Sequence, residues 1–443
     1  MIYYILQSDY NMRILFISND LIAGNIAHIL TKSGHQVRLY IAEKGRRGNF
    51  HNIISKTTNW KLDLKWVGKK GLIIFDDIGY GHHQDRLRKE GYNVFGGSLE
   101  GDRLEKDRVF AQEIFNEYKI KSIPSYNFSN IDDAISFVKK NPCAWVIKQN
   151  DHLSKSINFV GSFDDGRDVI EVLKSYKNNN LKIKTITLQK KIFGIEIAIT
   201  RYFNGSDWIG PSLINIEHKK FFPGDLGPTT SEMGTLGWYE DDEENRLVKG
   251  TLFKIKPYLS KINYRGIFDI NCIVNKKGIF PLEATSRFGS PIAHLQSELN
   301  ISPWFEILNS VSKSERYNLK YKKGFGIVVV IAIPPFPYAK KINDHSQVGT
   351  RIYFDKNIKE SEKKSIHFEE ISFDKVSKQY YISDDRGYIL YVTGVDKSIS
   401  NAIKRTYRLI EKIHIPKMFY RNDIGLKFMN KDILKLKKWG YIK

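Results

Sequence analysis

A carboxylate at the end of an apolar strand is the residue of this sequence that best suits metal-binding chemistry. Glu283 follows the apolar segment 278–282, and Asp269 or Asn271 would lie beside it on the paired strand. Carboxylate and amide oxygens, together with nucleotide phosphates, are the ligands that Mg²⁺ prefers. Arg287 follows closely, and its planar guanidinium can bind a phosphoryl or carboxylate group through two hydrogen bonds. A purely structural ion pair between Glu283 and Arg287 is the alternative.

The loop at residues 217–234 is the densest polar segment of the chain. Its glycine, proline and hydroxyl residues leave backbone amides free to bind an anion. His218, Lys219 and Lys220 add positive charge at its start, which suits phosphate or carboxylate groups. An ordinary surface loop has a similar composition, so the segment alone does not decide between the two interpretations.

Lys148 ends the apolar strand expected at residues 144–147. Its ammonium can reach triphosphate oxygens, or it can simply extend to solvent. Gln189 and Glu196 flank a turn at residues 193–194; Glu196 can accept hydrogen bonds from ribose hydroxyls or be an ordinary strand carboxylate. The sequence contains no glycine-rich phosphate loop with a lysine and no dinucleotide glycine motif in its first strand–helix turn.

The elements that must position these residues begin with alternating strands and helices. Strands are expected at 12–17, 36–42, 71–76 and 92–95, and helices at 25–33 and 86–90. This alternation predicts a parallel sheet with right-handed crossovers, in an α/β fold. Residues 1–11 precede the pattern and are interpreted as an N-terminal extension.

The rest of the chain is richer in strands. Strands within 144–203 and 250–300 are expected to form two facing sheets, and 324–394 is again strand-rich. Further helices are expected at 105–118, 132–140 and 398–413, and a hairpin is expected at 267–283. Three domains follow, with boundaries near residues 110 and 320.

Composition excludes some classes of protein. The 443 residues include 70 Lys and Arg against 49 Asp and Glu, a formal net charge of +21. Such a balance attracts polyanions, or it belongs to a lysine-rich solvated surface. With 41% apolar residues the chain is not globally disordered. Two distant cysteines, no secretion signal and no apolar run of about 20 residues predict a cytoplasmic protein without a membrane partner.

Short motifs in the same order along residues 12–425 resemble phosphoribosylamine–glycine ligase, the purine-pathway member of the ATP-grasp superfamily. The motifs are Val94-Phe95-Gly96-Gly97, residues 104–110, Val146-Ile147-Lys148, His218-Lys219-Lys220, residues 224–230 with Met233-Gly234, Leu282-Glu283, residues 286–291 and residues 419–425. The resemblance implies a Rossmann-like N-terminal domain at 12–110 and an ATP-grasp domain of two facing sheets at 111–320. It also implies a mobile subdomain at about 132–203 and a β-rich C-terminal cap at 321–443.

The chemistry that the resemblance implies is a carbon–nitrogen ligation. ATP phosphorylates a carboxylate, and an amine then attacks the acyl phosphate, which forms an amide and releases ADP and phosphate. Mg²⁺, or Mn²⁺ in its place, assists the phosphoryl transfer. The substrates would be a small amino acid and an amine that is itself phosphorylated in the family.

The resemblance also implies roles for particular residues. The implied catalytic residues are Arg287, Asp225 and Lys148. The implied ATP-binding residues are Arg108, Lys148, Lys155, Gln189 and Glu196. The implied substrate-binding residues are His218, Lys219, Asp225, Gly227, Pro228, Thr229, Thr230 and Arg287. The implied metal ligand is Glu283, helped by Asn271 or Thr285.

Several positions depart from the family pattern. Residues 149–156 lack the glycines that follow the strand-end lysine in the family, and Lys155 stands in for that loop's lysine. The other departures are Arg108 for a lysine, Gln189-Lys190 for an acidic pair, Ser231-Glu232 for two glycines, Thr285 for an asparagine and Ser290 for an aspartate. They leave open a ligase for glycine and phosphoribosylamine, a ligase for another amino acid and amine, and a non-catalytic descendant that binds a nucleotide or polyanion. Nucleic-acid binding is not favoured, because the sequence has no motif in which aromatic residues for base stacking are interleaved with basic residues.

Overall fold

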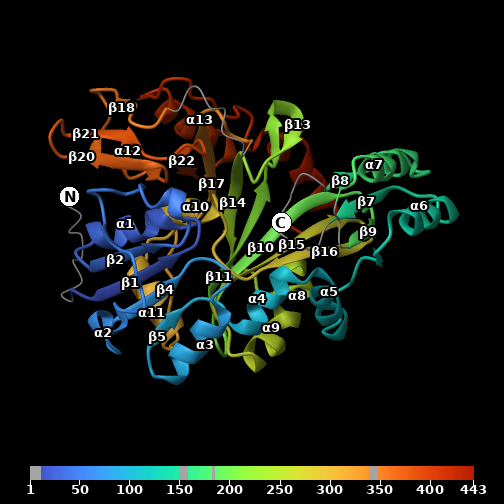
Figure 1. Ribbon diagram of the computed structural model, residues 1–443, viewed down its shortest axis with the longest axis horizontal. Helices are drawn as coiled ribbons and strands as arrows, with labels where there is room; N and C mark the ends of the chain where they lie inside the picture. The colour runs from blue at the N-terminus through green and yellow to red at the C-terminus, as the bar shows by residue number, and fades with distance from the viewer. Residues whose placement is uncertain (1–10, 149–157, 182–184, 339–346) are drawn as a thin grey trace.

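The protein is described by a computed structural model that covers residues 11–148, 158–181, 185–338 and 347–443. The N-terminal part is the predicted parallel sheet, with strand order β3-β2-β1-β4-β5 (Figure 1). Its elements are β1 (Arg13–Ser18), α1 (Gly24–Lys32), β2 (Gln36–Ile41), β3 (Ser55–Thr57), α2 (Leu64–Val67), β4 (Leu72–Phe75), α3 (Gly81–Lys89) and β5 (Asn93–Phe95). The alternation of strand and helix therefore predicted the parallel sheet, but it missed β3 and α2 and placed the start of α3 five residues too late.

The single helix expected at 105–118 is wrong, because the chain forms two helices there. These are α4 (Leu99–Lys106) and α5 (Arg108–Glu117). Asp107 separates them: its backbone is extended, and its Oδ1 accepts hydrogen bonds from the amides of Val109 and Phe110, both at 3.1 Å. An aspartate that caps a helix in this way satisfies amides that have no partner inside the helix. The break places Arg108 in the first turn of α5.

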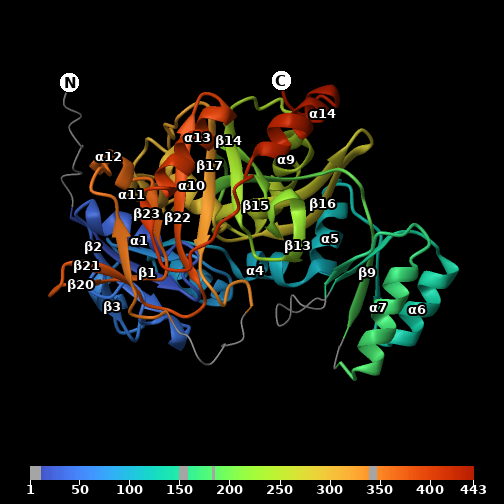
Figure 2. The same cartoon turned by 90° about the horizontal axis from the view of Figure 1, so that it is seen from above.

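A small antiparallel sheet forms a separate layer at one end of the molecule (Figure 2). Its strand order is β6-β9-β7-β8, and α6 and α7 pack on it around Val138, Trp145 and Leu173. The bounds are β6 (Ser125–Phe128), α6 (Ile131–Lys140), β7 (Trp145–Lys148), β8 (Phe159–Val160), α7 (Arg167–Asn178) and β9 (Ile186–Lys190). Lys148 thus ends a strand of this small sheet, as predicted.

A large sheet fills the centre, with strand order β16-β15-β10-β11-β14-β17-β22-β19. Its first strands are β10 (Ile195–Asn204), β11 (Trp208–Glu217), β14 (Gly234–Glu240), β15 (Arg265–Asn275) and β16 (Gly278–Thr285). The predicted hairpin at 267–283 is present as β15 and β16. The expectation that residues 195–203 belong to the first of two sheets is wrong for this strand, because β10 pairs with β15 and β11.

The C-terminal region continues the large sheet and adds a smaller one. β17 (Phe325–Ala332), β19 (Ile366–Phe368) and β22 (Tyr388–Asp396) extend the large sheet, so that sheet crosses the boundary expected at 320. The second sheet contains β18 (Arg351–Phe354), β20 (Ile371–Asp374), β21 (Gln379–Ile382) and β23 (Ile413–His414). The helices from residue 240 on are α8 (Arg246–Gly250), α9 (Leu252–Lys261), α10 (Ile292–Leu299), α11 (Trp304–Ser312), α12 (Glu360–Lys363), α13 (Ile399–Ile410) and α14 (Ile433–Lys438).

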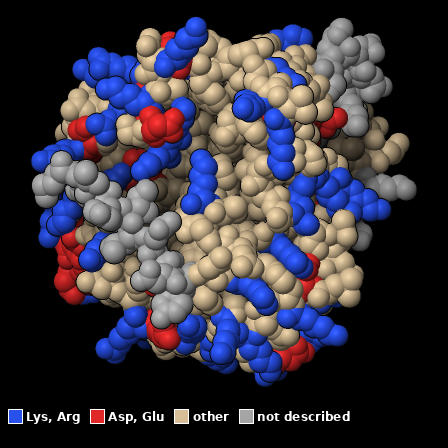
Figure 3. Space-filling view, turned by 90° about the vertical axis from the view of Figure 1, so that its left-hand side faces the viewer, with Lys and Arg blue, Asp and Glu red and all other residues tan. Residues whose placement is uncertain are grey.

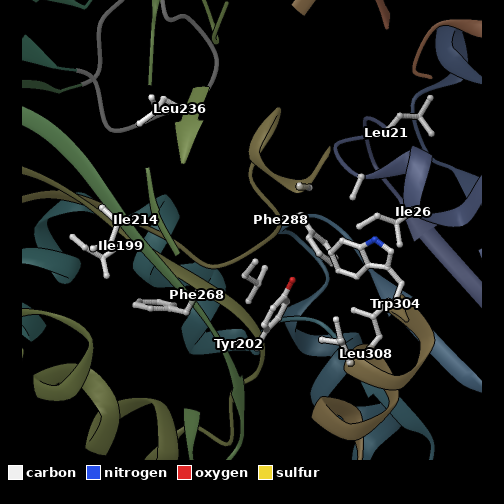
Figure 4. Close-up of a cluster of buried hydrophobic side chains, with 14 of the residues drawn as sticks. Leu21, Ile26, Ile199, Tyr202, Ile214, Leu236, Phe268, Phe288, Trp304 and Leu308 are labelled. Atoms are coloured by element: carbon white, nitrogen blue, oxygen red, sulfur yellow. The ribbon is translucent and has the colours of Figure 1, made fainter. Parts of the chain in front are cut away.

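The hydrophobic core joins the parallel sheet to the large sheet. Phe288 is fully buried and stands edge-on to Trp304, with ring centroids 6.0 Å apart (Figure 4). It also stacks on Phe95 at the end of β5, at 5.2 Å. Buried aromatic pairs of this kind fix the segments that carry them. The core therefore holds in place the neighbouring residue Arg287.

Positive charge is distributed rather than concentrated on the face drawn in Figure 3. Lys and Arg side chains are spread across it, with smaller groups of Asp and Glu between them. On this face the charge fits the interpretation of a lysine-rich solvated surface. None of the helices in the described part of the chain combines the length and apolar character that crossing a membrane requires.

Candidate active site

Five strands of the large sheet turn polar side chains to one face. Because side chains alternate between the two faces of a strand, directly paired residues share a face. The pairs Asn271–Glu283, Asp269–Thr285 and Thr200–Asp269 therefore lie on the same side, and the register of β10 with β11 adds the pair Glu217–Thr235 to it. We call this side the polar face and define it by Glu196, Thr200, Asn215, Glu217, Thr235, Asp269, Asn271, Glu283 and Thr285. On the other side, the alternate residues of β10 and β15 are buried and mainly apolar.

Glu283 and Asn271 meet on adjacent strands at the edge of the polar face. They are directly opposite in the β15–β16 pairing. Asn271 is buried, and its Oδ1 has no hydrogen-bond donor among the described residues. A carboxylate beside an unpaired amide oxygen suits Mg²⁺, although the described residues contain no group of three His, Cys, Asp or Glu side chains able to hold a metal. Mg²⁺ would therefore take its remaining ligands from phosphates and water.

Positive charges surround Glu283. Arg108 Nη2 lies 3.1 Å from Glu283 Oε2. Burial by itself would raise the pKa of Glu283, but the charges of Arg108, Lys219 and Lys148 lower it to about 2. Glu283 therefore stays ionised. The structural alternative, a pair with Arg287, is not what the structure shows, because the carboxylate pairs with Arg108 instead.

Lys148 comes to this cluster from the small sheet. Its backbone pairs with Thr187 of β9. Burial lowers the pKa of Lys148 to about 7, and the charge of Arg108 acts in the same direction, while Glu283 and Glu196 oppose it. The side chain of Lys148 is half-buried, and these interactions place its ammonium near the polar face. A cation whose burial opposes its charge gains most from a ligand that brings negative charge.

Lys219 occupies the middle of the polar face rather than the outer part of the loop. Its Nζ lies 2.6 Å from Glu196 Oε1 and 2.8 Å from Glu217 Oε2. Burial opposes its charge, but Glu217, Glu196 and Glu283 raise its pKa well above the usual value. Lys219 is therefore a permanent cation, and Glu196 is occupied by it in this state.

Arg287 is held by the N-terminal part of the chain. Its Nε donates to Glu105 Oε1 at 2.9 Å and lies 3.6 Å from Asp77 Oδ1. Glu105 Oε2 accepts from the amide of Ser286 at 2.8 Å. Glu105 thus fixes both the guanidinium and the backbone before it. These contacts use Nε, and Nη1 donates to the carbonyl of Phe288. Nη2 has no partner among the described residues, so it can bind a ligand.

The loop that carries Asp225 docks on the C-terminal segment. It forms a hairpin of β12 (Lys220–Phe222) and β13 (Leu226–Thr229). Asp225 Oδ1 accepts from Arg421 Nη1 at 3.1 Å, and its Oδ2 lies 2.8 Å from Lys427 Nζ. Asp225, which was predicted to be catalytic, thus forms two ion pairs that connect the loop to residues 421–427.

His218 has no free ring nitrogen. Its Nε2 accepts from the amide of Gly425 at 3.2 Å, so its Nδ1 donates to the carbonyl of Gly234, also at 3.2 Å. Burial and Arg421 lower its pKa to about 4, which keeps the ring neutral. The predicted contact with substrate is therefore not open to the ring in this structure.

The other residues predicted to bind ATP, substrate or metal differ in their location and contacts. Thr230 is buried and donates to the carbonyl of Lys219 at 2.9 Å. Gln189 is buried, and its Nε2 donates to Ser125 Oγ at 3.0 Å. Gly227, Pro228 and Thr229 lie on β13, away from the core, and Thr285 faces the same side as Glu283. Lys155 lies outside the described residues.

Four residues that complete the site were given no role from the sequence, although Glu217 begins the polar segment 217–234 and Glu105 lies in the motif 104–110. Glu217, Asn215 and Thr200 lie on the polar face, and Glu105 holds Arg287. Asn215 and Glu217 had a detectable signal, because polar residues alternate with apolar ones in an otherwise apolar strand. The contact of Glu105 with Arg287 had no such signal, because the two residues are 182 positions apart.

The chain is similar in sequence to proteins of known function. Residues 106–293 match the family model of the phosphoribosylglycinamide synthetase ATP-grasp (A) domain. The phosphoribosylamine–glycine ligase of Clostridium acetobutylicum is 23% identical over 380 residues, which cover 82% of this chain and 84% of the relative. The enzyme of the same name from Fusobacterium nucleatum subsp. nucleatum is 23% identical over 388 residues, which cover 85% of this chain and 87% of the relative.

Solved structures share the fold. The phosphoribosylamine–glycine ligase of Thermotoga maritima superposes with a TM-score of 0.72 at 20% identity, over 93% of this chain and 100% of that one. The biotin carboxylase domain of Hydrogenobacter thermophilus 2-oxoglutarate carboxylase, a complex with MgADP, gives 0.64 at 14% identity, over 98% and 99%. The predicted fold class and the resemblance stated from the sequence motifs are confirmed.

Proposed function

We propose that this chain, a diverged relative of the phosphoribosylamine–glycine ligases in the ATP-grasp superfamily, is an ATP-dependent carboxylate–amine ligase. One observation carries the proposal: the half-buried Lys148 of the small sheet lies close enough to Glu283 of the large sheet for their charges to interact, and Asn271 lies opposite that carboxylate. A cation facing a carboxylate and an amide oxygen is the arrangement that a metal–triphosphate complex requires. The relatives carry the same activity in their names.

The proposed reaction needs charge neutralisation at the transferring phosphoryl group. Bound Mg²⁺ would supply part of it, held by Glu283 and Asn271 with Thr285 nearby. Arg108 supplies fixed positive charge in a partly buried setting, where it counts for more than in water. Lys148 adds a second positive charge, which a bound triphosphate stabilises. When the triphosphate binds, Arg108 can exchange its contact with Glu283 for a phosphate oxygen.

Arg287 is the group best placed to orient the acyl phosphate. Glu105 and Asp77 hold one side of its guanidinium, and Nη2 remains for a phosphoryl or carboxylate oxygen. A pre-oriented guanidinium binds such oxygens with little loss of freedom. The amine then attacks the carbonyl carbon, the new C–N bond forms and phosphate leaves.

Two substrate pairs compete within this proposal. Glycine and phosphoribosylamine, which the relatives' names give, would place the chain in purine biosynthesis. The changes at Gln189-Lys190, Ser231-Glu232 and Ser290 favour a different amino acid or amine. The division into domains at about 110 and 320 also remains part of the proposal.

A substrate panel tests the proposal. The purified protein is mixed with ATP, Mg²⁺ and pairs of amino acids and amines that include glycine with phosphoribosylamine. ADP release that requires both members of a pair, with an amide product seen by mass spectrometry, is the expected result. No substrate-dependent ADP release across the panel would refute the ligase. Binding of MgATP without turnover would then support the non-catalytic, nucleotide-binding alternative.

A further inference from the structure

Two buried acceptors of the polar face have no hydrogen-bond donor among the described residues. The Oδ1 atoms of Asn215 and Asp269 have no hydrogen-bond partner among the described residues, and these side chains are 1% and 8% exposed. Their orientation is fixed, because Asn215 Nδ2 donates to Thr200 Oγ1 at 3.4 Å and Thr200 Oγ1 donates to Asp269 Oδ2. Buried acceptors without donors are costly, so a ligand that donates hydrogen bonds would satisfy them.

Glu232 adds a carboxyl group to the same region. It is 6% exposed, and its Oε1 accepts a hydrogen bond from Thr235 Oγ1. Thr235 is paired with Glu217 across β11 and β14, so Glu232 lies close to Glu217. Glycine stands at this position in the family that the motifs resemble. The side chain is therefore an addition of this chain to the polar face.

The carboxyl groups of this region outnumber its cations. Lys219 contacts Glu196 and Glu217, while Glu232 and Asp269 have no ion pair of 4.0 Å or less with a described cation. Burial and the charge of Glu217 raise the pKa of Glu232, and the charge of Lys219 opposes this only in part. A positive ligand would remove this imbalance.

We propose that Glu232 is a specificity-determining residue that, with Asp269 and Asn215, binds an ammonium group of the substrate. An ammonium group carries a positive charge and three N–H donors, which match the two unpaired oxygens and the carboxyl group. Bound as a cation it has no lone pair, so it is a recognition group and not the nitrogen that attacks the acyl phosphate. The inference rests on the proposed function and specifies a substrate that carries an ammonium beside its reacting group.

The test compares probes that differ in one ammonium group. The pairs are glycine and glycolate, alanine and lactate, and 1,3-diaminopropane and 3-aminopropanol. Each is titrated by calorimetry into the full chain with Mg²⁺ and a non-hydrolysable ATP analogue. Glu232→Gln removes the charge and keeps the size of the side chain. Glu243→Gln is the matched control, because Glu243 pairs with Arg201 at 2.8 Å, and Arg201 is on the opposite face of β10.

We expect wild type to bind at least one ammonium-bearing probe tenfold or more tightly than its hydroxyl counterpart. Glu232→Gln should reduce that preference about tenfold or more, the scale for a buried hydrogen bond to a charged group. Glu243→Gln should leave it unchanged, and nucleotide affinity should be the same in all three proteins. Glu232→Gly, which restores the family's residue, should lose the preference too and replaces Glu232→Gln if that variant does not fold.

Three results would overturn the inference: no probe binds, no pair shows the preference, or the preference survives in the Glu232 variants. The same probes also separate this inference from the proposed function. A preference that depends on Glu232, in a protein that releases no ADP with any substrate pair, would keep the ammonium site and remove the ligase. ADP release with an unchanged preference would do the reverse.

Discussion

Replacing Glu283 by glutamine separates a metal ligand from a structural carboxylate. Glu283→Gln keeps the size and hydrogen-bonding capacity of the side chain and removes its charge. If Glu283 holds Mg²⁺ against the transferring phosphoryl group, ADP formation should fall by a factor on the order of 10² or more. The fold should survive, because no described donor other than Arg108 forms an ion pair with this carboxylate.

The cost to stability follows from the surroundings of Glu283. Its pKa lies at about 2 instead of 4.5. Because each pKa unit is worth about 1.4 kcal/mol, the favourable interaction is at most about 3.5 kcal/mol. Since 34% of the side chain is exposed, solvent screening reduces this, and we expect a loss of about 1 kcal/mol. The stabilisation is complete above pH 4.5 and disappears as the pH falls toward 2.

Two measurements on the same protein check this prediction. Urea unfolding at pH 7 gives the change in stability, and coupled ADP release over a Mg²⁺ series gives the change in catalysis. Glu243→Gln again serves as the control. A variant with full activity and normal Mg²⁺ dependence would refute the role as metal ligand. A loss of several kcal/mol with catalysis intact would show that Glu283 is structural.

Three further predictions follow. Burial lowers the pKa of Lys148 to about 7, so between pH 7 and 10.5 the folded protein binds fewer protons than the unfolded chain, and its stability should rise with pH. Lys148→Met should abolish this rise. Urea unfolding at pH 7 and 9.5 measures this, and an equal rise in the variant would contradict it. Asp225→Asn should weaken the contact with Arg421 and increase amide hydrogen exchange in residues 220–229; unchanged exchange would oppose the docking role. Glu105→Gln should raise the KM of the carboxylate substrate more than that of ATP, because Glu105 orients Arg287; equal changes in both would count against it.

The sequence predicted those parts of the fold that depend on local periodicity. The alternation of apolar strands and helices before residue 95 indicated a parallel sheet, and the hairpin of β15 and β16 follows from its turn at residues 275–278. Because paired residues share a face, that hairpin also brings Asn271 beside Glu283. The position of this candidate metal site was therefore accessible from the residue pattern alone.

Contacts between distant segments could not be predicted in the same way. Nothing in the local sequence indicates that Glu105 reaches Arg287, or that Arg421 reaches Asp225 across 196 residues. The break between α4 and α5 depends on the cap formed by Asp107. The sequence predicted one helix here because the apolar periodicity continues through the break. Glu232 stood out only as a departure from a glycine, and its burial on the polar face becomes clear only once Thr235 is placed beside Glu217.

The transfer of oxygen from carboxylate to phosphate tests the central claim most directly. The carboxylic acid that supports ADP release is supplied with ¹⁸O in both carboxylate oxygens, and the released phosphate is examined by mass spectrometry. A ligase that works through an acyl phosphate breaks the bond between carbon and the bridging oxygen, so each phosphate should carry one ¹⁸O. Phosphate released without ¹⁸O, while the amide product forms, would contradict the proposed reaction.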